Sequence, residues 1–260
     1  MSKLNPRELG NLVYKALESM SAARKVRDVG RASSQGGLSQ YKTECFFKAF
    51  QLFFESGQNI KDLVGRARSS DIRYVNTGAQ RLSVPELLLI AAECYEQAAL
   101  AADHLGDFET AVRCMELATS QVDNKKFDDS SFSTSVLASV NNNFGWFLFR
   151  KGDPEKLPEA RRRIESAIQL YSKMCRPDKR RLAELNLENI EKKERGEDVE
   201  LDKIKGFRSM AGGGPAVSSD YGSNLPNAVK FGENYCAAQW SPDGTWVIIN
   251  GKKLNILIQP

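Results

Sequence analysis

The sequence has no long apolar run. None of its 260 residues lies in a stretch that approaches the ~18 consecutive apolar residues of a membrane-spanning helix. Residues 1–9 contain no apolar core of a secretory signal peptide. We therefore expect a protein of the cytoplasm, with the nucleus as the alternative, and no membrane span.

Cysteine and histidine are scarce as well. The five cysteines are odd in number and never closer than 20 residues, a spacing that predicts neither a disulfide framework nor a zinc site. The one histidine, His104, precedes a Gly-Asp turn with no nucleophile nearby in the sequence. The segment Gly212–Pro215 lacks the lysine and the serine or threonine of a phosphate-binding loop. We therefore expect no catalytic site, no cofactor and no metal.

Charge is distributed unevenly along the chain. Residues 81–149 contain 4 basic and 10 acidic side chains, whereas residues 1–80 contain 13 and 7, and residues 150–208 contain 17 and 13. An acidic middle between basic flanks suggests polar recognition surfaces or subunit contacts. A solvated surface of mixed charge is the alternative interpretation.

Apolar residues recur at helical spacing through most of the chain, which predicts a mainly α protein. Ser83 and Glu86 form a capping-box pattern with Pro85 between them, a typical helix start. Aromatic residues on the second helix exceed one stripe, so we expect that helix to be covered on two sides. The predicted helices span 5–30, 39–56, 60–67, 83–104, 108–121, 133–151, 158–174 and 177–195.

Two segments share one internal spacing. The first has an aromatic, a small residue, a Gly-Asp-aromatic turn, and then alanine, a large apolar residue and alanine. These residues are Tyr95, Ala99, Gly106, Asp107, Phe108, Ala111, Met115 and Ala118. The second comprises Gly145, Gly152, Asp153, Ala160, Ile164 and Ala167.

This pattern resembles the tetratricopeptide family over residues 90–195. The resemblance implies antiparallel helical hairpins in an α-solenoid, because small residues let two helices cross closely. Ala102 and Asp123 depart from the family pattern, and the two turns lie 46 residues apart against a family period of about 34. We therefore expect residues 122–132 to loop out of the array.

The chain divides into four predicted parts. Residues 1–80 form an N-terminal helical layer that does not fit the repeat when aligned on Gly57, and residues 83–195 form the repeat domain. Residues 196–230 have the Gly, Ser and Pro composition of a flexible linker. In residues 231–260, Asp243-Gly244 and Asn250-Gly251 separate strand-like runs, which predicts a small three-stranded β meander. The meander either caps the helices or adds to a sheet in a partner or a second copy.

The resemblance also implies a binding surface, because the first helix of each tetratricopeptide hairpin lines a concave groove. We expect an adaptor or assembly subunit that binds a peptide there, with a basic end near Glu93 and an acidic or aromatic end near Trp146. Packing of Trp146 against a neighbouring helix, with solvated charges, is the alternative. The predicted partner-binding residues are Glu93, Glu96, Leu100, Asp103, Asn142, Asn143, Trp146, Phe149, Arg150 and Arg180, with Ser139 and Arg181 beside them.

RNA binding is the competing hypothesis. Two basic runs, Arg161–Arg163 and Lys179–Arg181, could contact phosphates along one side of a helical array. The acidic middle of the chain argues against this function, since it would repel a phosphate backbone. Glutamates such as Glu159 and Glu165 also dilute the first run.

Overall fold

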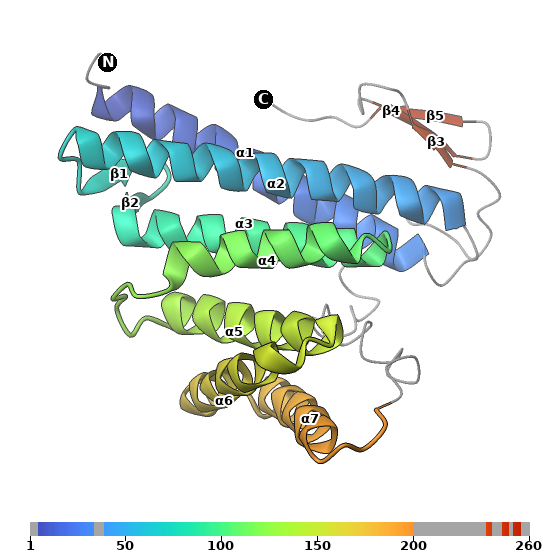
Figure 1. Ribbon diagram of the computed structural model, residues 1–260. Helices are drawn as coiled ribbons and strands as arrows, with labels where there is room; N and C mark the ends of the chain where they lie inside the picture. The colour runs from blue at the N-terminus through green and yellow to red at the C-terminus, as the bar shows by residue number, and fades with distance from the viewer. Residues whose placement is uncertain (1–4, 34–38, 200–237, 241–245, 250–251, 256–260) are drawn as a thin grey trace.

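The computed structural model describes residues 5–33, 39–199, 238–240, 246–249 and 252–255. Seven α-helices form this part of the chain, and helices adjacent in sequence pack in pairs (Figure 1). Helix α1 packs on α2, α3 on α4, and α5 on α6, while α7 packs on α6. The bounds are α1 Pro6–Ser33, α2 Ser39–Ser69, α3 Val84–His104, α4 Phe108–Val122, α5 Ser131–Lys151, α6 Leu157–Lys173 and α7 Pro177–Glu194. The expectation of a mainly helical protein is confirmed.

The helix ends follow local sequence signals. Ser83 Oγ accepts from the Glu86 amide at 3.3 Å and Glu86 Oε2 accepts from the Ser83 amide at 2.7 Å, so the predicted capping box is present at α3. Gly106 and Gly152 adopt positive φ angles of 83° and 75°, which glycine tolerates better than other residues. These two glycines end α3 and α5 and let the chain reverse.

Small residues bring the paired helices close together, as expected. Ala99 is fully buried, and Gly145 of α5 faces α6. A Cβ on Gly145 would lie 2.6 Å from Ile164 Cγ1 and 2.8 Å from the Ala160 carbonyl oxygen. One cluster of buried apolar side chains extends from Leu9 in α1 to Ile190 in α7.

The first helical layer differs from the expectation. The predicted helices 39–56 and 60–67 are a single helix, α2, and Gly57 lies inside it. A Cβ at Gly57 would lie 3.0 Å from the Tyr95 ring, so this glycine makes room for an aromatic side chain of α3 and does not form a turn. An antiparallel β hairpin follows α2 where a plain connection was expected. Its strands are β1 (Tyr74–Asn76) and β2 (Arg81–Ser83).

Three further strands lie in the C-terminal part of the chain. They are β3 (Ala238–Trp240), β4 (Trp246–Ile249) and β5 (Lys252–Asn255), with β4 paired antiparallel to both neighbours. The predicted turns at Asp243-Gly244 and Asn250-Gly251, and most of the predicted linker, lie outside the described residues. The meander as a folded unit therefore stays a prediction.

No helix within the described ranges is long and apolar enough to cross a membrane.

Candidate functional site

A polar network joins the inner helices of the array. Glu96 of α3 is only 1% exposed, and its Oε1 accepts hydrogen bonds from Ser139 Oγ and, at 2.5 Å, from Asn143 Nδ2. Asn142 Nδ2 donates to Asn143 Oδ1 at 3.3 Å, and Asn186 Nδ2 of α7 donates to Asn142 Oδ1 at 3.1 Å. The network therefore ties α3, α5 and α7 together.

Burial dominates the electrostatics of Glu96. Loss of solvation raises the pKa of this carboxyl from 4.5 to about 7, although its hydrogen bonds from Ser139 and Asn143 act in the opposite direction. Glu93 raises the pKa further and Lys179 lowers it. A buried carboxylate is costly unless it is well paired, so Glu96 gains and loses its proton near neutral pH.

Two ion pairs flank this network, one on either side of Glu96 along α3. Glu93 Oε1 accepts from Arg24 Nη2 of α1 at 2.6 Å. Asp103 Oδ1 accepts from Arg150 Nη1 of α5 at 2.8 Å, and the Arg150 guanidinium lies over the Phe108 ring at 4.7 Å. These contacts occupy the charged groups that were expected to meet a partner.

The structure thus brings most of the predicted groove residues together, but inside the bundle. Leu100 is half-buried, and Arg180, on the exposed face of α7, pairs with Glu184 at 2.7 Å. The burial differs from the expected open groove because α5 packs directly on α3 and α7 closes over α5. The buried members of the set are Glu96, Asn142, Asn143, Trp146 and Phe149.

The two basic runs are largely neutralised by neighbouring acids. Arg161 pairs with Glu194 at 2.8 Å and also reaches Glu191 and Glu165. Arg163 forms a bidentate salt bridge with Asp123, in which Nη1 donates to Oδ1 and Nη2 to Oδ2, each at 2.6 Å. Arginines in such pairs are poor candidates for phosphate binding, because a phosphate would have to displace a carboxylate.

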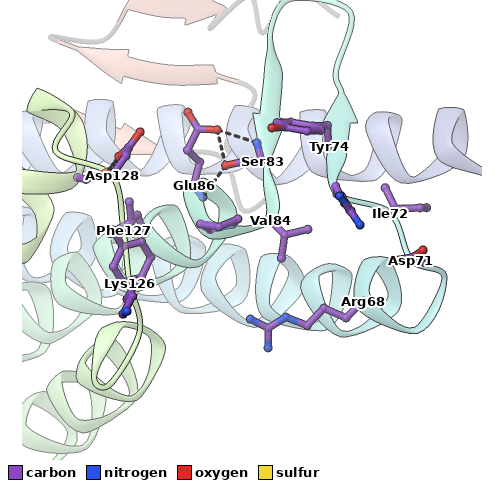
Figure 2. A pocket seen from close by; sticks show the side chains of 14 residues that line it. Arg68, Asp71, Ile72, Tyr74, Ser83, Val84, Glu86, Lys126, Phe127 and Asp128 are labelled. Atoms are coloured by element: carbon purple, nitrogen blue, oxygen red, sulfur yellow. Dashed lines mark hydrogen bonds between the residues drawn. The ribbon is translucent and has the colours of Figure 1, made fainter.

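A cleft, the end cleft, opens at the N-terminal end of α3, the end away from the Asp103–Arg150 ion pair. Its volume is about 530 Å³. Three walls surround it: the C-terminal end of α2, the β1–β2 hairpin with the first turn of α3, and the loop between α4 and α5 (Figure 2). The first turn of α5 completes the lining through Ser133.

Cations around this cleft lack acidic partners. Arg68 of α2, Arg73 before β1 and Lys126 of the α4–α5 loop line the cleft and are exposed. In the part of the chain that the structure describes, none of the three forms an ion pair within 4.0 Å. Burial lowers the pKa of the nearby Lys125 and Arg68 lowers it further, whereas Asp123 raises it.

Two of the three acids in the lining are already engaged. Glu86 Oε2 accepts from the amide and hydroxyl of Ser83, both at 2.7 Å. Asp128 Oδ1 accepts from Ser130 Oγ at 2.8 Å and from Ser133 Oγ, and these bonds hold the pKa of Asp128 below its usual value. Both carboxylates lie at helix N-termini, where the helix dipole offsets their charge. Asp71, in the turn after α2, is the third acid.

Apolar side chains form the remaining surface of the cleft. Ile72, Val84 and Phe127 line it together with Tyr74, which is 52% exposed. The Arg81 guanidinium lies over the Tyr74 ring at 4.2 Å, close enough for a cation–π contact. The cleft therefore combines an accessible aromatic ring, apolar walls and charged edges, as ligand sites commonly do.

Sequence reasoning missed this cleft. The sequence predicts a connection over residues 69–82 and a loop outside the array over residues 122–132, yet these segments supply half of the residues that line the cleft. One local signal was available: Thr77-Gly78 separates two short runs with a central apolar residue, Val75 and Leu82, which is a hairpin pattern. The juxtaposition with Lys126 and Phe127 had no sequence signal.

Comparison with protein families found no family model that matches the chain, and comparison with curated proteins found no match.

Proposed function

We propose that this protein is a non-catalytic adaptor or assembly subunit, built from tetratricopeptide-like helical hairpins, that recognises a partner protein at the end cleft. One observation carries the proposal. The charged residues that the sequence placed on the groove are bonded within the chain, and we call this set the inner face (Glu93, Glu96, Asp103 and Arg150, with Ser139 and Asn143). In contrast, Arg68, Arg73 and Lys126 surround an open cleft without an acidic partner among the described residues. A surface that leaves cations unpaired beside an exposed aromatic ring is suited to binding.

The paired helices support the family part of the proposal. The close crossing at Gly145 and the glycine turns at Gly106 and Gly152 are the features on which the tetratricopeptide resemblance depends. The partner surface, however, moves from the concave groove to the end of the array. Trp146 is only 8% exposed, and its ring lies 5.4 Å from that of Phe149 on the same helix.

The C-terminal strands offer a second contact. We propose that β3, β4 and β5 form the three-stranded meander expected from the sequence. The meander then docks either on the helices as a cap or on the edge of a sheet in a partner or a second copy. A three-stranded unit is only marginally stable by itself, which favours either form of docking.

RNA binding is the weaker candidate. Arg161 and Arg163 are committed to carboxylates, and the cleft itself contains Asp71. A phosphate polymer would have to overcome both features.

Affinity capture from a cell lysate tests the adaptor proposal. The bait is the full-length chain, and the test variant carries Arg68→Glu and Arg73→Glu. The matched control is Arg162→Glu, because Arg162 is also exposed and forms no ion pair among the described residues. We expect a partner that is retained by the wild type and the control and lost by the test variant.

Retention of the same partner by all three baits would show that recognition occurs elsewhere on the chain. Absence of any partner that survives washing at moderate salt would contradict the adaptor function itself. Nuclease treatment of the lysate separates a protein partner from one bridged by RNA.

A further inference from the structure

We infer that the end cleft binds an extended, acidic segment of a partner protein and seats one of its apolar side chains beside Tyr74 and Phe127. This inference rests on the proposed adaptor function and specifies the chemistry of the partner. Three features of the cleft carry it: the geometry of its cations, the state of its acids and the nature of its apolar walls.

The cations surround the cleft from separate elements. Arg68 extends from α2, and Lys126 lies on the α4–α5 loop across the cleft (Figure 2). Arg73 also lines the cleft and comes directly before β1 in the chain. Guanidinium groups bind carboxylates through two parallel hydrogen bonds, and lysine adds a point charge. Acidic side chains spaced along an extended segment could therefore each meet a cation on a different wall.

The lining acids oppose such a ligand less than their number suggests. Glu86 and Asp128 accept hydrogen bonds from the residues that begin α3 and α5, and positive helix ends compensate their charge. Asp71 alone lies outside these caps. It lines the cleft in the turn that follows Arg68 by three residues, so this point of the cleft favours an amide or a basic residue in the ligand.

The apolar walls distinguish a peptide from a small anion. Ile72 and Phe127, which are half-buried, and the exposed Tyr74 ring would gain from burial by an apolar side chain, since burial of apolar surface is the main non-directional source of affinity. A free phosphate would leave this surface in water. A volume of about 530 Å³ lies within the range of ligand pockets and suits a short segment.

Charge complementarity also selects the class of polymer. A nucleic acid has a negative charge at every phosphate, so some phosphates would lie against Asp71 or near Glu86. An acidic peptide can place its carboxylates at the cations and neutral residues elsewhere. The alternation of charges around the cleft therefore fits a protein segment better than a nucleic acid.

Selection from a random dodecapeptide display library tests the inference with the full-length protein as target. We expect enriched peptides that combine an excess of Asp and Glu with a central large apolar residue. A fluorescent synthetic copy of an enriched peptide is then titrated against the wild type, the Arg68→Glu/Arg73→Glu variant and the Arg162→Glu control. The cleft variant should bind about tenfold or more weakly and the control within about twofold of the wild type, and added salt should weaken wild-type binding.

A neutral pair, Arg68→Gln with Arg73→Gln, covers the case in which charge reversal disturbs folding, and circular dichroism checks each variant. Enriched peptides without acidic residues, equal weakening by Arg162→Glu, or tighter binding of a single-stranded RNA dodecamer would each overturn the inference. So would no enrichment over an unrelated target protein. If the lysate experiment still retains a cleft-dependent partner, only the acidic-segment chemistry fails; if it retains none, the adaptor function fails with it.

Discussion

The inner face and the end cleft contain the same kinds of side chain in opposite states. On the inner face Glu96 is bonded to Ser139 and Asn143, and Asp103 to Arg150. Around the cleft Arg68 and Arg73 have no ion-pair partner within the described residues. Polar groups that hold helices together must be satisfied within the chain, whereas groups that bind a partner must be left available. The inner face should therefore govern stability, and the cleft should govern binding.

The largest expected effect disturbs α5, the helix that carries Ser139, Asn143 and Arg150 of the inner face, by forcing it away from α6. Gly145→Val places carbon atoms where Ile164 and the Ala160 carbonyl already lie. Overpacking of this kind typically lowers the free energy of unfolding by about 1–3 kcal/mol, and occasionally by more. We expect a variant that is unfolded or has lost about that much free energy of unfolding in urea. Gly65→Ala is the matched control, because a Cβ there meets nothing within 4 Å and should stabilise α2 by about 0.5–1 kcal/mol. Equal stability of Gly145→Val and wild type would contradict the close crossing.

The next effect concerns the proton on Glu96. The unfolded chain loses this proton near pH 4.5 and the folded chain near pH 7, so the folded state holds more protons between these values. Stability from this group is therefore full below pH 4.5 and is lost as the pH rises to about 7. The wild type should lose roughly 3 kcal/mol from this source between pH 5 and pH 8, and Glu96→Gln should not.

Urea unfolding at both pH values measures the Glu96 contribution as the difference between the two proteins. Glu109→Gln serves as the control, because its carboxylate is exposed and pairs with Arg113 on the surface. The same pH response in Glu96→Gln as in wild type would show that Glu96 is not the group responsible.

A smaller effect distinguishes a buried from an exposed ion pair. The side chains of Arg150 and Asp103 are 14% and 13% exposed, and those of Arg113 and Glu109 are 72% and 78% exposed. Arg150→Met should cost about 2 kcal/mol, since it leaves Asp103 without its partner. Arg113→Met should cost a few tenths of a kcal/mol at most. Thermal unfolding of the two variants side by side checks the ranking, and similar losses would mean that Asp103 is better solvated than its burial indicates.

The smallest expected effect on stability concerns the arginines of the end cleft. Arg68→Glu and Arg73→Glu remove no ion pair, so each should change the free energy of unfolding by no more than about 0.5 kcal/mol. Urea unfolding tests this for the same variants that are expected to lose the partner. A large loss of stability would show that these arginines hold the hairpin or the α4–α5 loop in place.

Local signals in the sequence determined where most helices begin and end. The capping box at Ser83, the glycine turns at Gly106 and Gly152, and the small residues Ala99 and Gly145 all act as expected. Each depends on residues within a few turns of one helix or on the contact between two consecutive helices. Such short-range chemistry can be inferred from spacing and residue type alone.

Only the tertiary structure decided which polar residues are buried. Glu96 and Asn143 have the residue types and the helical spacing of an exposed groove, but α5 packs on α3 and covers them. Tertiary packing also explains Gly57, which the sequence alone suggests is a turn. In the fold it lies inside α2 and leaves space for the Tyr95 ring. The end cleft takes its walls from segments about 60 residues apart, between Arg68 and Lys126. Periodicity records which residues share a face of a helix, whereas accessibility depends on what packs against that face from distant parts of the chain.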